Sequence, residues 1–315
     1  MAYRFQRQES IDDGVRRIVS EQVEKAIGEL KDESMDRAEA IHQVRKRCKK
    51  IRAVVRLIRP ENESLYKQEN AIFRDLAGDV SALRDLDVMI GTLDGLAKDV
   101  PRDAQGSYEA IRKVLLGRRE KLTGKDSVSS EALEALHRSL KDSLERVADW
   151  NINGRGFAGL RKGLKKTYSR GRTAMSRAYD EGTSESFHDW RKRAKYHWYH
   201  VRLLENVWKR PMRARAKVLC NLGNDLGVDH DFAVLKEVIL SQSEWFGRYD
   251  PIHSILSLID HHRELLEEAV LPLGKHLYAE KPEGFVKRMQ KHWRVWRKDE
   301  EGAACFETLQ NESAL

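Results

Sequence analysis

The stretch AIHQVRKRCKKIRAVVRLIRP, residues 40–60, decides how this chain folds. From residue 42 to residue 60 it contains eight lysines and arginines and no aspartate or glutamate. Drawn as a helix at about 100° per residue, its basic side chains gather on one side and its apolar side chains on the other. The pattern therefore predicts an amphipathic helix with one face in a hydrophobic core and a cationic stripe on the opposite face.

The first cationic stripe consists of His42, Arg45, Lys49, Arg52 and Arg56, with Lys46 beside it. Its members fall within an arc of about 80° over four helical turns. Like charges at this spacing destabilise a solvated helix by roughly 0.2–0.5 kcal/mol per pair. A simple solvated face is the alternative interpretation. We favour a bound anion, because nothing acidic within residues 42–60 offsets the repulsion.

The same pattern returns 146 residues later, in SFHDWRKRAKYHWYHVRLLENV, residues 186–207. Aligned without a gap, residues 42–88 match their counterparts at twelve of 47 positions. The identical pairs are His42/His188, Arg45/Arg191, Lys46/Lys192, Arg47/Arg193, Lys49/Lys195, Val55/Val201, Arg56/Arg202, Leu57/Leu203, Leu76/Leu222, Asp79/Asp225, Asp85/Asp231 and Val88/Val234. A constant offset across two helices and their turn favours an internal duplication over two unrelated amphipathic helices.

The whole chain has the periodicity of helices. Apolar spacing predicts helices over residues 10–32, 36–59, 62–95, 103–124, 129–149, 155–180, 184–208, 211–242, 249–277 and 282–300. No run of alternating β-branched residues is long enough to predict a strand. The segment DWNINGRG, residues 149–156, predicts a junction between a first half, 1–150, and a second half, 151–315. We expect an all-α fold of two pseudo-symmetric helical bundles that face a basic central groove or pore.

Two further basic faces lie in the second half. The repeated stripe consists of His188, Arg191, Lys195 and Arg202, with Lys192 beside it, and Trp198 takes the place of Arg52. Residues 154–179 contain eight basic residues and again no acid. There Arg161, Lys165, Tyr168 and Arg172 share an arc of about 60°. Because consecutive helices of a bundle pack side by side, we expect these two faces to form one groove.

The composition limits the class of partner. A net charge of +8 and a pI near 9.3 indicate a polyanionic partner. The three cysteines have no motif spacing, which argues against a disulfide framework and against a zinc site. The first residues contain no apolar signal segment, and no stretch approaches the roughly 20 apolar residues of a membrane span. We therefore expect a cytoplasmic protein that does not act at a membrane.

The stripes suit a phosphate chain without bases. Proteins that bind single-stranded nucleic acids interleave aromatic side chains with basic ones, so that bases can stack. The first stripe has no aromatic residue, and the second has only Trp198. Arginine offers planar bidentate contacts to phosphate, and lysine offers a compact charge. Histidine adds a donor with an unperturbed pKa of ~6.5.

These residues resemble the CHAD family, the conserved-histidine α-helical domain, in which basic residues follow a histidine at +3, +7, +10 and +14. The segments TYSRGR (167–172), LRDLDVMIGTL (83–93) and LGVDHDFAVL (226–235) are also similar to family segments. The resemblance implies that residues 1–315 form a single CHAD domain with pseudo-twofold symmetry. It implies inorganic polyphosphate binding by the three basic faces, association with polyphosphate granules, and no catalysis. Trp198 departs from the pattern, so we assign it no phosphate contact.

An enzymatic alternative rests on three carboxylates. Asp225, Asp229 and Asp231 could hold Mg²⁺ together with phosphate oxygens in a phosphohydrolase. A helix–helix turn in which Asp225 and Asp231 cap helices or pair with arginines is the competing interpretation. His197 and His200 have a spacing that a metal could use, but without a third ligand we expect packed core histidines. We expect no cofactor, no metal and no specific nucleic acid, although generic nucleic-acid binding stays open.

Gly223 and Gly227 form no phosphate-binding loop motif. Four residues apart on one predicted helix, they lie on the same face. Their spacing therefore indicates close helix packing.

Overall fold

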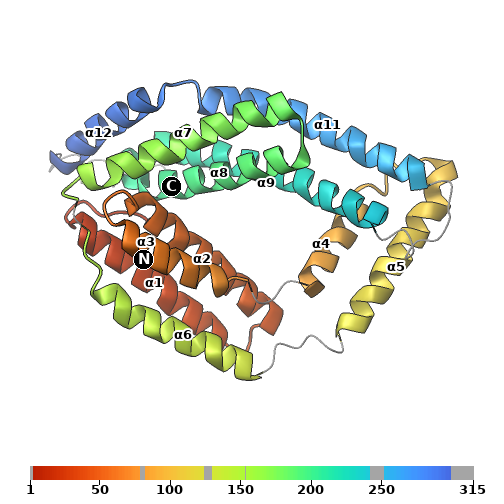
Figure 1. The fold of residues 1–315 in the computed structure, drawn as a ribbon, viewed down its shortest axis with the longest axis horizontal. Helices are drawn as coiled ribbons and strands as arrows, with labels where there is room; N and C mark the ends of the chain where they lie inside the picture. The colour runs from red at the N-terminus through yellow and green to blue at the C-terminus, as the bar shows by residue number, and fades with distance from the viewer. Residues whose placement is uncertain (1–2, 79–81, 124–129, 153, 242–251, 299–315) are drawn as a thin grey trace, which may run out of the picture.

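The computed structural model is helical throughout the residues that it describes, which are 3–78, 82–123, 130–152, 154–241 and 252–298 (Figure 1). Within these ranges there are eleven α-helices, two short 3-10 helices and no strand. The helices are α1 (Ile11–Lys31), α2 (Arg37–Ile58), α3 (Glu63–Asp75), α4 (Ala82–Gly95), η1 (Arg102–Ala104), α5 (Gln105–Thr123), α6 (Ser130–Ala148), α7 (Ala158–Glu181), α8 (Ser184–Leu203), η2 (Glu205–Val207), α9 (Lys209–Ser241), α11 (Ile252–Leu277) and α12 (Pro282–Lys298). The all-α prediction is confirmed.

The expected helix over 62–95 is the one that differs clearly. It divides into α3 and α4, because the backbone N–H groups of Leu76, Ala77 and Gly78 form turn hydrogen bonds that end α3. The corresponding helix of the second half, α9, is continuous. Adding the offset of 146 to residues 63 and 95 gives 209 and 241, which are the bounds of α9. One long helix in the second half therefore corresponds to two in the first.

Side-chain caps explain where several helices begin. The hydroxyl of Ser10 accepts the backbone N–H of Asp13 at the start of α1. Thr183 and Ser186 form a reciprocal capping box at the start of α8. At the preceding helix end, Gly182 has φ +61°, a left-handed conformation that glycine adopts without a Cβ penalty. These local signals place α7 and α8 directly after one another.

A large hydrophobic cluster holds α1, α2, α3, α6, α7, α8, α12 and the first part of α9 together. The predicted apolar face of α2 is confirmed, since Val44, Cys48, Ile51, Val54, Val55 and Ile58 are all buried. Trp190 of α8 belongs to the same cluster. The first and second halves of the chain therefore share this core.

A second, smaller cluster lies at the other side of the molecule (Figure 1). It joins α4 and α5 to the end of α9 and the start of α11, with Leu93, Leu115, Leu235 and Ile259 fully buried. It too draws on both halves. The expected pair of bundles, one per half, is therefore wrong as a description of the cores. Each cluster contains helices of both halves, and α9 of the second half runs from one cluster into the other.

The packing partners nevertheless repeat between the halves. Helix α1 packs on α2 and α6, and α7 packs on α8 and α12. In the same way, α2 packs on α3 and α4 on α5, while α9 packs on both α8 and α11. The halves meet where α2 crosses α8, and there His200 Nε2 lies 2.9 Å from the carbonyl oxygen of Ala53. This crossing positions the basic faces.

Candidate functional site

The stripe of α2 lies on the face opposite its buried side. Lys46 and Lys49 are exposed, and His42, Arg45, Arg52 and Arg56 are partly buried. Arg52 Nε donates to Asn70 Oδ1 of α3 at 3.3 Å, which is an amide and not a carboxylate. Arg56 Nη2 lies 3.4 Å from the hydroxyl of Tyr196 on α8. The stripe therefore leads along α2 to the crossing with α8.

The stripe of α8 divides between two neighbours. His188 stacks on His230 of α9 with ring centroids 3.8 Å apart, and Lys195 Nζ donates to Asn224 Oδ1 at 3.1 Å. Arg202 lies instead near the N-terminal segment, where its guanidinium carbon is 5.8 Å from the ring centroid of Tyr3. The same carbon is 4.9 Å from the ring centroid of Trp198 on α8. Lys192 is exposed, 4.0 Å from the carboxylate of Asp189.

The glycines of α9 make room for the α8 stripe. A Cβ at Gly223 would lie 2.9 Å from Cε of Lys195, and a Cβ at Gly227 would lie 3.2 Å from Nε of Arg191. The interpretation of these two glycines as a close-packing site is confirmed. Basic side chains of α8 pack against these two glycines and therefore lie between α8 and α9.

The face of α7 chosen from the sequence is not the one that meets α2 and α8. Arg161 and Lys165 both bind the carboxylate of Glu283 on α12, the latter at 2.7 Å. Tyr168 is fully buried, and its hydroxyl donates to the carbonyl of Glu280 at 3.0 Å. The assignment of Tyr168 to a groove is wrong, because it is buried. Arg161 and Lys165 stay about half exposed, but they pair with α12 and do not meet the α2 and α8 stripes. Arg172 lies one turn beyond Tyr168 on the same face and is partly buried.

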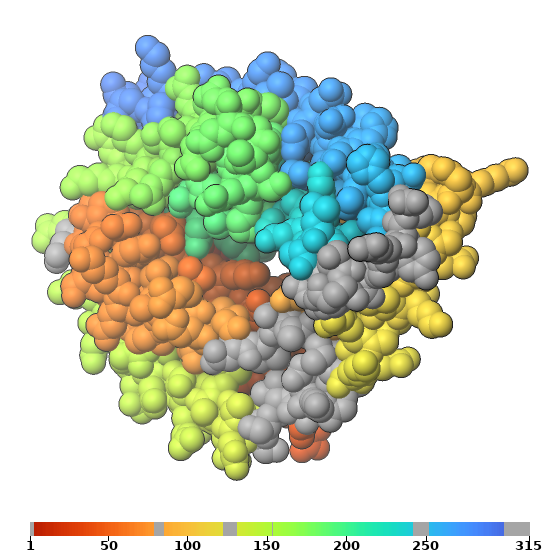
Figure 2. Space-filling view, turned by 45° about the vertical axis from the view of Figure 1, so that its right-hand side comes forward, coloured from red at the N-terminus to blue at the C-terminus, as the bar shows by residue number. Residues whose placement is uncertain are grey.

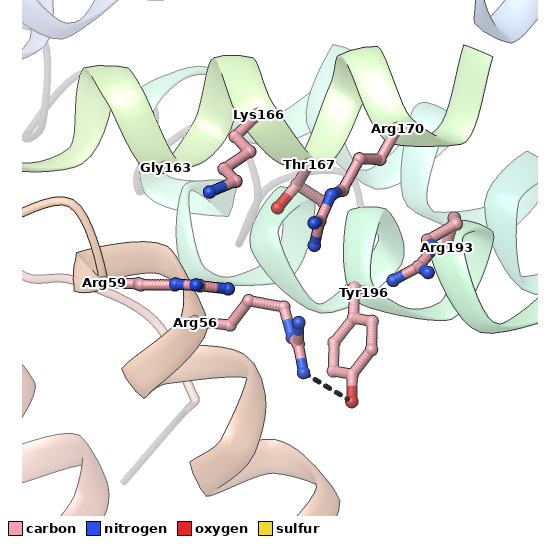
Figure 3. A pocket seen from close by; sticks show the side chains of 8 residues that line it. All are labelled: Arg56, Arg59, Gly163, Lys166, Thr167, Arg170, Arg193 and Tyr196. Carbon is pink, nitrogen blue, oxygen red and sulfur yellow. Dashed lines mark hydrogen bonds between the residues drawn. The ribbon is translucent and has the colours of Figure 1, made fainter. Parts of the chain in front are cut away.

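A different face of α7 lines a shallow basic pocket at the crossing, which we call the α7 pocket (Figure 3). Its lining residues are Arg56 of α2 and Arg59 directly after it, Gly163, Lys166, Thr167 and Arg170 of α7, and Arg193 and Tyr196 of α8. Five of the eight are basic and none is acidic. The space inside is only about 10 Å³, so a ligand would lie across the pocket and not within it.

Like charges in the α7 pocket act on one another. Burial lowers the pKa of Arg170, and the neighbouring Arg193, Arg56 and Arg59 lower it further. Two of these arginines have carboxylate partners outside the pocket, since Arg59 binds Glu63 at 2.7 Å and Arg193 binds Asp189 at 3.0 Å. These two pairings offset only part of the charge of the five basic residues. The cluster keeps a local excess of positive charge that an anion would neutralise.

The histidine of the α8 stripe is neutral at pH 7. Burial lowers the pKa of His188 to about 4, and the adjacent His230 contributes to the same direction. Burial also lowers the pKa of His230, with Arg191 and Lys192 contributing. In the unliganded protein, His188 is therefore expected to change its charge at acid pH and not near neutral pH.

The surface is hollowed near the middle of the face shown in Figure 2, between α2, in red-orange, and α9, in cyan. The α2 stripe runs along α2, and the α8 stripe packs against α9. The α2 stripe thus belongs to a helix that borders this hollow, and the α8 stripe packs against the other bordering helix, α9.

A comparison with models of protein families identifies the family of this chain. The model of the CHAD domain matches residues 17–240, from α1 to the end of α9. The chain belongs to the CHAD domain family. No curated protein matches it. Helices α11 and α12 lie outside the matched part of this CHAD domain, and Glu283, which binds Arg161 and Lys165, lies with them.

Sequence reasoning missed six side chains of the α7 pocket, namely Arg59, Lys166, Thr167, Arg170, Arg193 and Tyr196. One signal for them was present, because Arg47 and Arg193 are an identical pair of the repeat. Gly163 was a second signal, since a glycine among basic residues of α7 marks the face that approaches another helix. Helical spacing alone did not choose between the two basic faces of α7.

The carboxylates of the enzymatic alternative are not arranged as a set of metal ligands. Asp229 is buried and its Oδ1 accepts Arg263 Nε at 2.8 Å. The expected helix–helix turn is wrong, because residues 225–231 lie within the continuous helix α9. Burial raises the pKa of Asp225. His197 and His200 are fully buried in the large cluster, as expected for packed histidines. Across the described residues, no group of three histidine, cysteine or acidic side chains is placed to hold a metal ion.

No helix within the described ranges is long and apolar enough to cross a membrane.

Proposed function

We propose that this CHAD domain binds linear inorganic polyphosphate through the basic surface around the α2–α8 crossing. The observation that carries the proposal is the α7 pocket, where five basic side chains from three helices converge without an acidic one. The α2 and α8 stripes extend this surface away from the crossing on both helices. A chain with a regular negative charge would neutralise these groups in succession.

A phosphate chain fits this surface better than a nucleic acid does. Stacking of bases requires aromatic faces that are open to the ligand. Here the guanidinium of Arg56 lies 4.1 Å from the ring centroid of Tyr196, and that of Arg202 lies 4.9 Å from that of Trp198. The aromatic rings at the crossing are already covered by arginines, which leaves phosphate contacts as the main interaction.

We further infer that the two halves are related by a pseudo-twofold axis through the crossing, so that their stripes border one groove. The agreement between the bounds of α9 and the α3–α4 pair supports this symmetry. The repeated packing partners support it as well. The α2 stripe and the α8 stripe, without Arg202, would then form two related walls of a path for the polymer.

The proposal is for a binding module without catalytic activity, present in the cytoplasm at polyphosphate granules. The engagement of Asp229 with Arg263 supports it against the Mg²⁺-dependent alternative. Incubation of the saturated complex with Mg²⁺ is expected to release no phosphate. Release of phosphate that is lost on replacing Asp225 and Asp231 by asparagine would establish the enzyme instead.

Neighbouring lysines of α7 provide the sharpest test. Lys166 lines the α7 pocket, whereas Lys165 binds Glu283 on the other side of the same helix. We expect Lys166→Met to weaken polyphosphate binding about threefold to tenfold, as for loss of one charged contact. Lys165→Met removes the same charge and is expected to leave the affinity within about twofold.

Fluorescence anisotropy with a labelled long-chain polyphosphate measures both affinities, and an RNA of equal total charge serves as the competitor. Preference for polyphosphate over RNA is expected. Equal weakening by the two lysine variants would show that only net charge matters. Equal affinity for RNA would reduce the function to general polyanion binding.

A further inference from the structure

A second pocket lies on the other side of the α2–α8 crossing, and we call it the α1 pocket. It has a volume of about 210 Å³, well above the roughly 10–15 Å³ that one water molecule requires. Its lining residues are Tyr3 and Arg4 of the N-terminal segment, Gln22 and Lys25 of α1, Arg47 and Lys50 of α2, Arg202 of α8, and Glu205 of η2. Five of these eight are basic and one is acidic.

The α1 pocket is the duplicate of the α7 pocket. Adding 146 to positions 47, 50, 56 and 59 gives 193, 196, 202 and 205, and each pair has one member in each pocket. Adding 145 to positions 22 and 25 of α1 gives 167 and 170 of α7, which are again lining residues. Six of the eight positions thus correspond. Two sites of common origin lie on opposite sides of one helix crossing.

One substitution between the duplicates explains their different volumes. The α7 pocket has Tyr196, whose ring lies against Arg56 and fills the space. The equivalent position of the α1 pocket holds Lys50, which is slender and leaves an open cavity. The duplicate of Arg56 is Arg202, so both pockets keep an arginine at this point. The α1 pocket has therefore become a chamber for a small ligand.

The charges in the chamber are only partly neutralised. Glu205 binds Arg4 at 2.7 Å, and Glu29 binds Arg47 at 2.5 Å. In the part of the chain that the structure describes, Lys50 and Arg202 form no ion pair, and each lies 5.8 Å from the ring centroid of Tyr3. Two positive charges thus face the cavity without a carboxylate partner.

Neutral groups complete the lining as donors. Gln22 is 1% exposed, and its side-chain oxygen lies 3.4 Å from Arg47 Nη1. Its amide N–H groups form no hydrogen bond within the described residues. The hydroxyl of Tyr3 donates to the carbonyl of Lys50 at 2.9 Å, which holds the ring beside the cations. Donors and positive charges around a small polar cavity are the requirements of an oxyanion site.

We propose that the α1 pocket binds one phosphate dianion, with Lys50 and Arg202 supplying its charge partners and Gln22 a hydrogen bond. The ligand is either a free phosphate ion or the terminal phosphate of a chain, since both present a tetrahedral group with close to two negative charges. An internal phosphate of a polymer carries about one charge and would therefore gain less from the two cations than a dianion does. The site is separate from the α7 pocket and does not depend on polyphosphate binding there.

The protonation of Lys50 provides a second signature. Burial lowers the pKa of Lys50 to about 8, and Arg47, Arg202 and Lys25 lower it further while Glu29 opposes them. The other charged groups around it are Arg4 and Glu205, and burial keeps Tyr3 protonated by raising the pKa of its phenol. Because binding requires the ammonium form, phosphate affinity is expected to fall as the pH rises above about 8.

Isothermal titration of the full chain with inorganic phosphate tests the proposal. One saturable site per chain is expected, and Lys50→Met is expected to weaken it at least about tenfold. Lys49→Met removes the adjacent charge on another face of α2 and is expected to retain phosphate binding. Thermal melting without phosphate checks that both variants fold. Wild-type protein without a saturable site, or equal binding by Lys50→Met, would overturn the proposal.

Polyphosphate titrations on the same variants separate this site from the proposed function. Lys50→Met is expected to retain polyphosphate affinity, whereas Lys166→Met is expected to retain phosphate affinity. A free-ended short chain that displaces phosphate would identify chain ends as the ligand, and failure to displace it would identify the free ion. Equal displacement by a chain with esterified ends would overturn the site, because the pocket would then not distinguish a dianion from internal phosphates.

Discussion

A single glycine sets how closely α7 approaches α2. A Cβ built on Gly163 would lie 1.7 Å from the backbone carbonyl oxygen of Leu57. Because that neighbour is backbone, it cannot rotate away as a side chain would. The short distance brings Lys166 and Arg170 of α7 beside Arg56 of α2. The charge of the α7 pocket thus depends on a residue that has no charge.

Gly163→Ala is expected to destabilise the protein by about 1–3 kcal/mol or more, the usual range for overpacking. Chemical denaturation measures the free energy of unfolding. Gly28→Ala is the matched control, because Gly28 lies within α1 and a Cβ added there would meet no neighbouring atom within 4 Å. That variant is expected to be neutral or stabilised by roughly 0.5–1 kcal/mol. Equal stability of the two variants would contradict the close approach of α7.

At the scale of elements, the α2–α8 crossing contains a buried histidine. His200 of α8 is fully buried, and its Nε2 lies 2.9 Å from the carbonyl of Ala53 on α2. Burial lowers the pKa of His200 to about 4, although the hydrogen bond to Ala53 opposes this. The neutral ring therefore joins two helices that belong to different halves of the chain.

This histidine makes stability depend on acid pH. In the unfolded chain its pKa is ~6.5, so between about pH 6.5 and 4 the unfolded state binds a proton that the folded state excludes. The free energy of unfolding is expected to fall through this window by on the order of 3 kcal/mol and to be unaffected by His200 above it. Denaturation at several pH values measures the change. His200→Gln is expected to flatten the profile between pH 6.5 and 5, and an unchanged profile would contradict the assignment.

At the scale of the molecule, two hydrophobic clusters are joined by α9 and α11. The larger cluster carries α2, α7 and α8, from which the α7 pocket is built. The smaller cluster carries α4, α5, the end of α9 and the start of α11. Loss of packing in the smaller cluster should therefore leave most of the proposed binding surface in place.

Leu115 of α5 and Leu164 of α7 are both fully buried, one in each cluster. Replacement by alanine is expected to cost about 2–5 kcal/mol in either case. Hydrogen exchange is expected to increase in α4, α5 and α11 for Leu115→Ala, with polyphosphate affinity within about twofold of wild type. For Leu164→Ala, exchange should increase in α7 and α8, and the affinity should fall. An equal loss of affinity in both variants would show that the clusters act as one unit.

The sequence by itself determined the helices and the two basic stripes that begin with His42 and His188. Helical periodicity and charge are local properties, so residues close in the chain report them directly. The buried face of α2 was predicted from the same periodicity, and so was the burial of His197 and His200. The break between α3 and α4 was not, because it depends on turn hydrogen bonds at Leu76 to Gly78.

Only the tertiary structure decided which basic face of α7 is available. Residues 155–177 carry basic side chains on more than one face, and the choice depends on α12, more than a hundred residues away, whose Glu283 binds Arg161 and Lys165. The tertiary structure also decided that Lys50 and Arg202 share a cavity, because these residues come from two helices that meet at the crossing. Long-range contacts of this kind depend on the shape and charge of both partners, and no local period of the sequence records them.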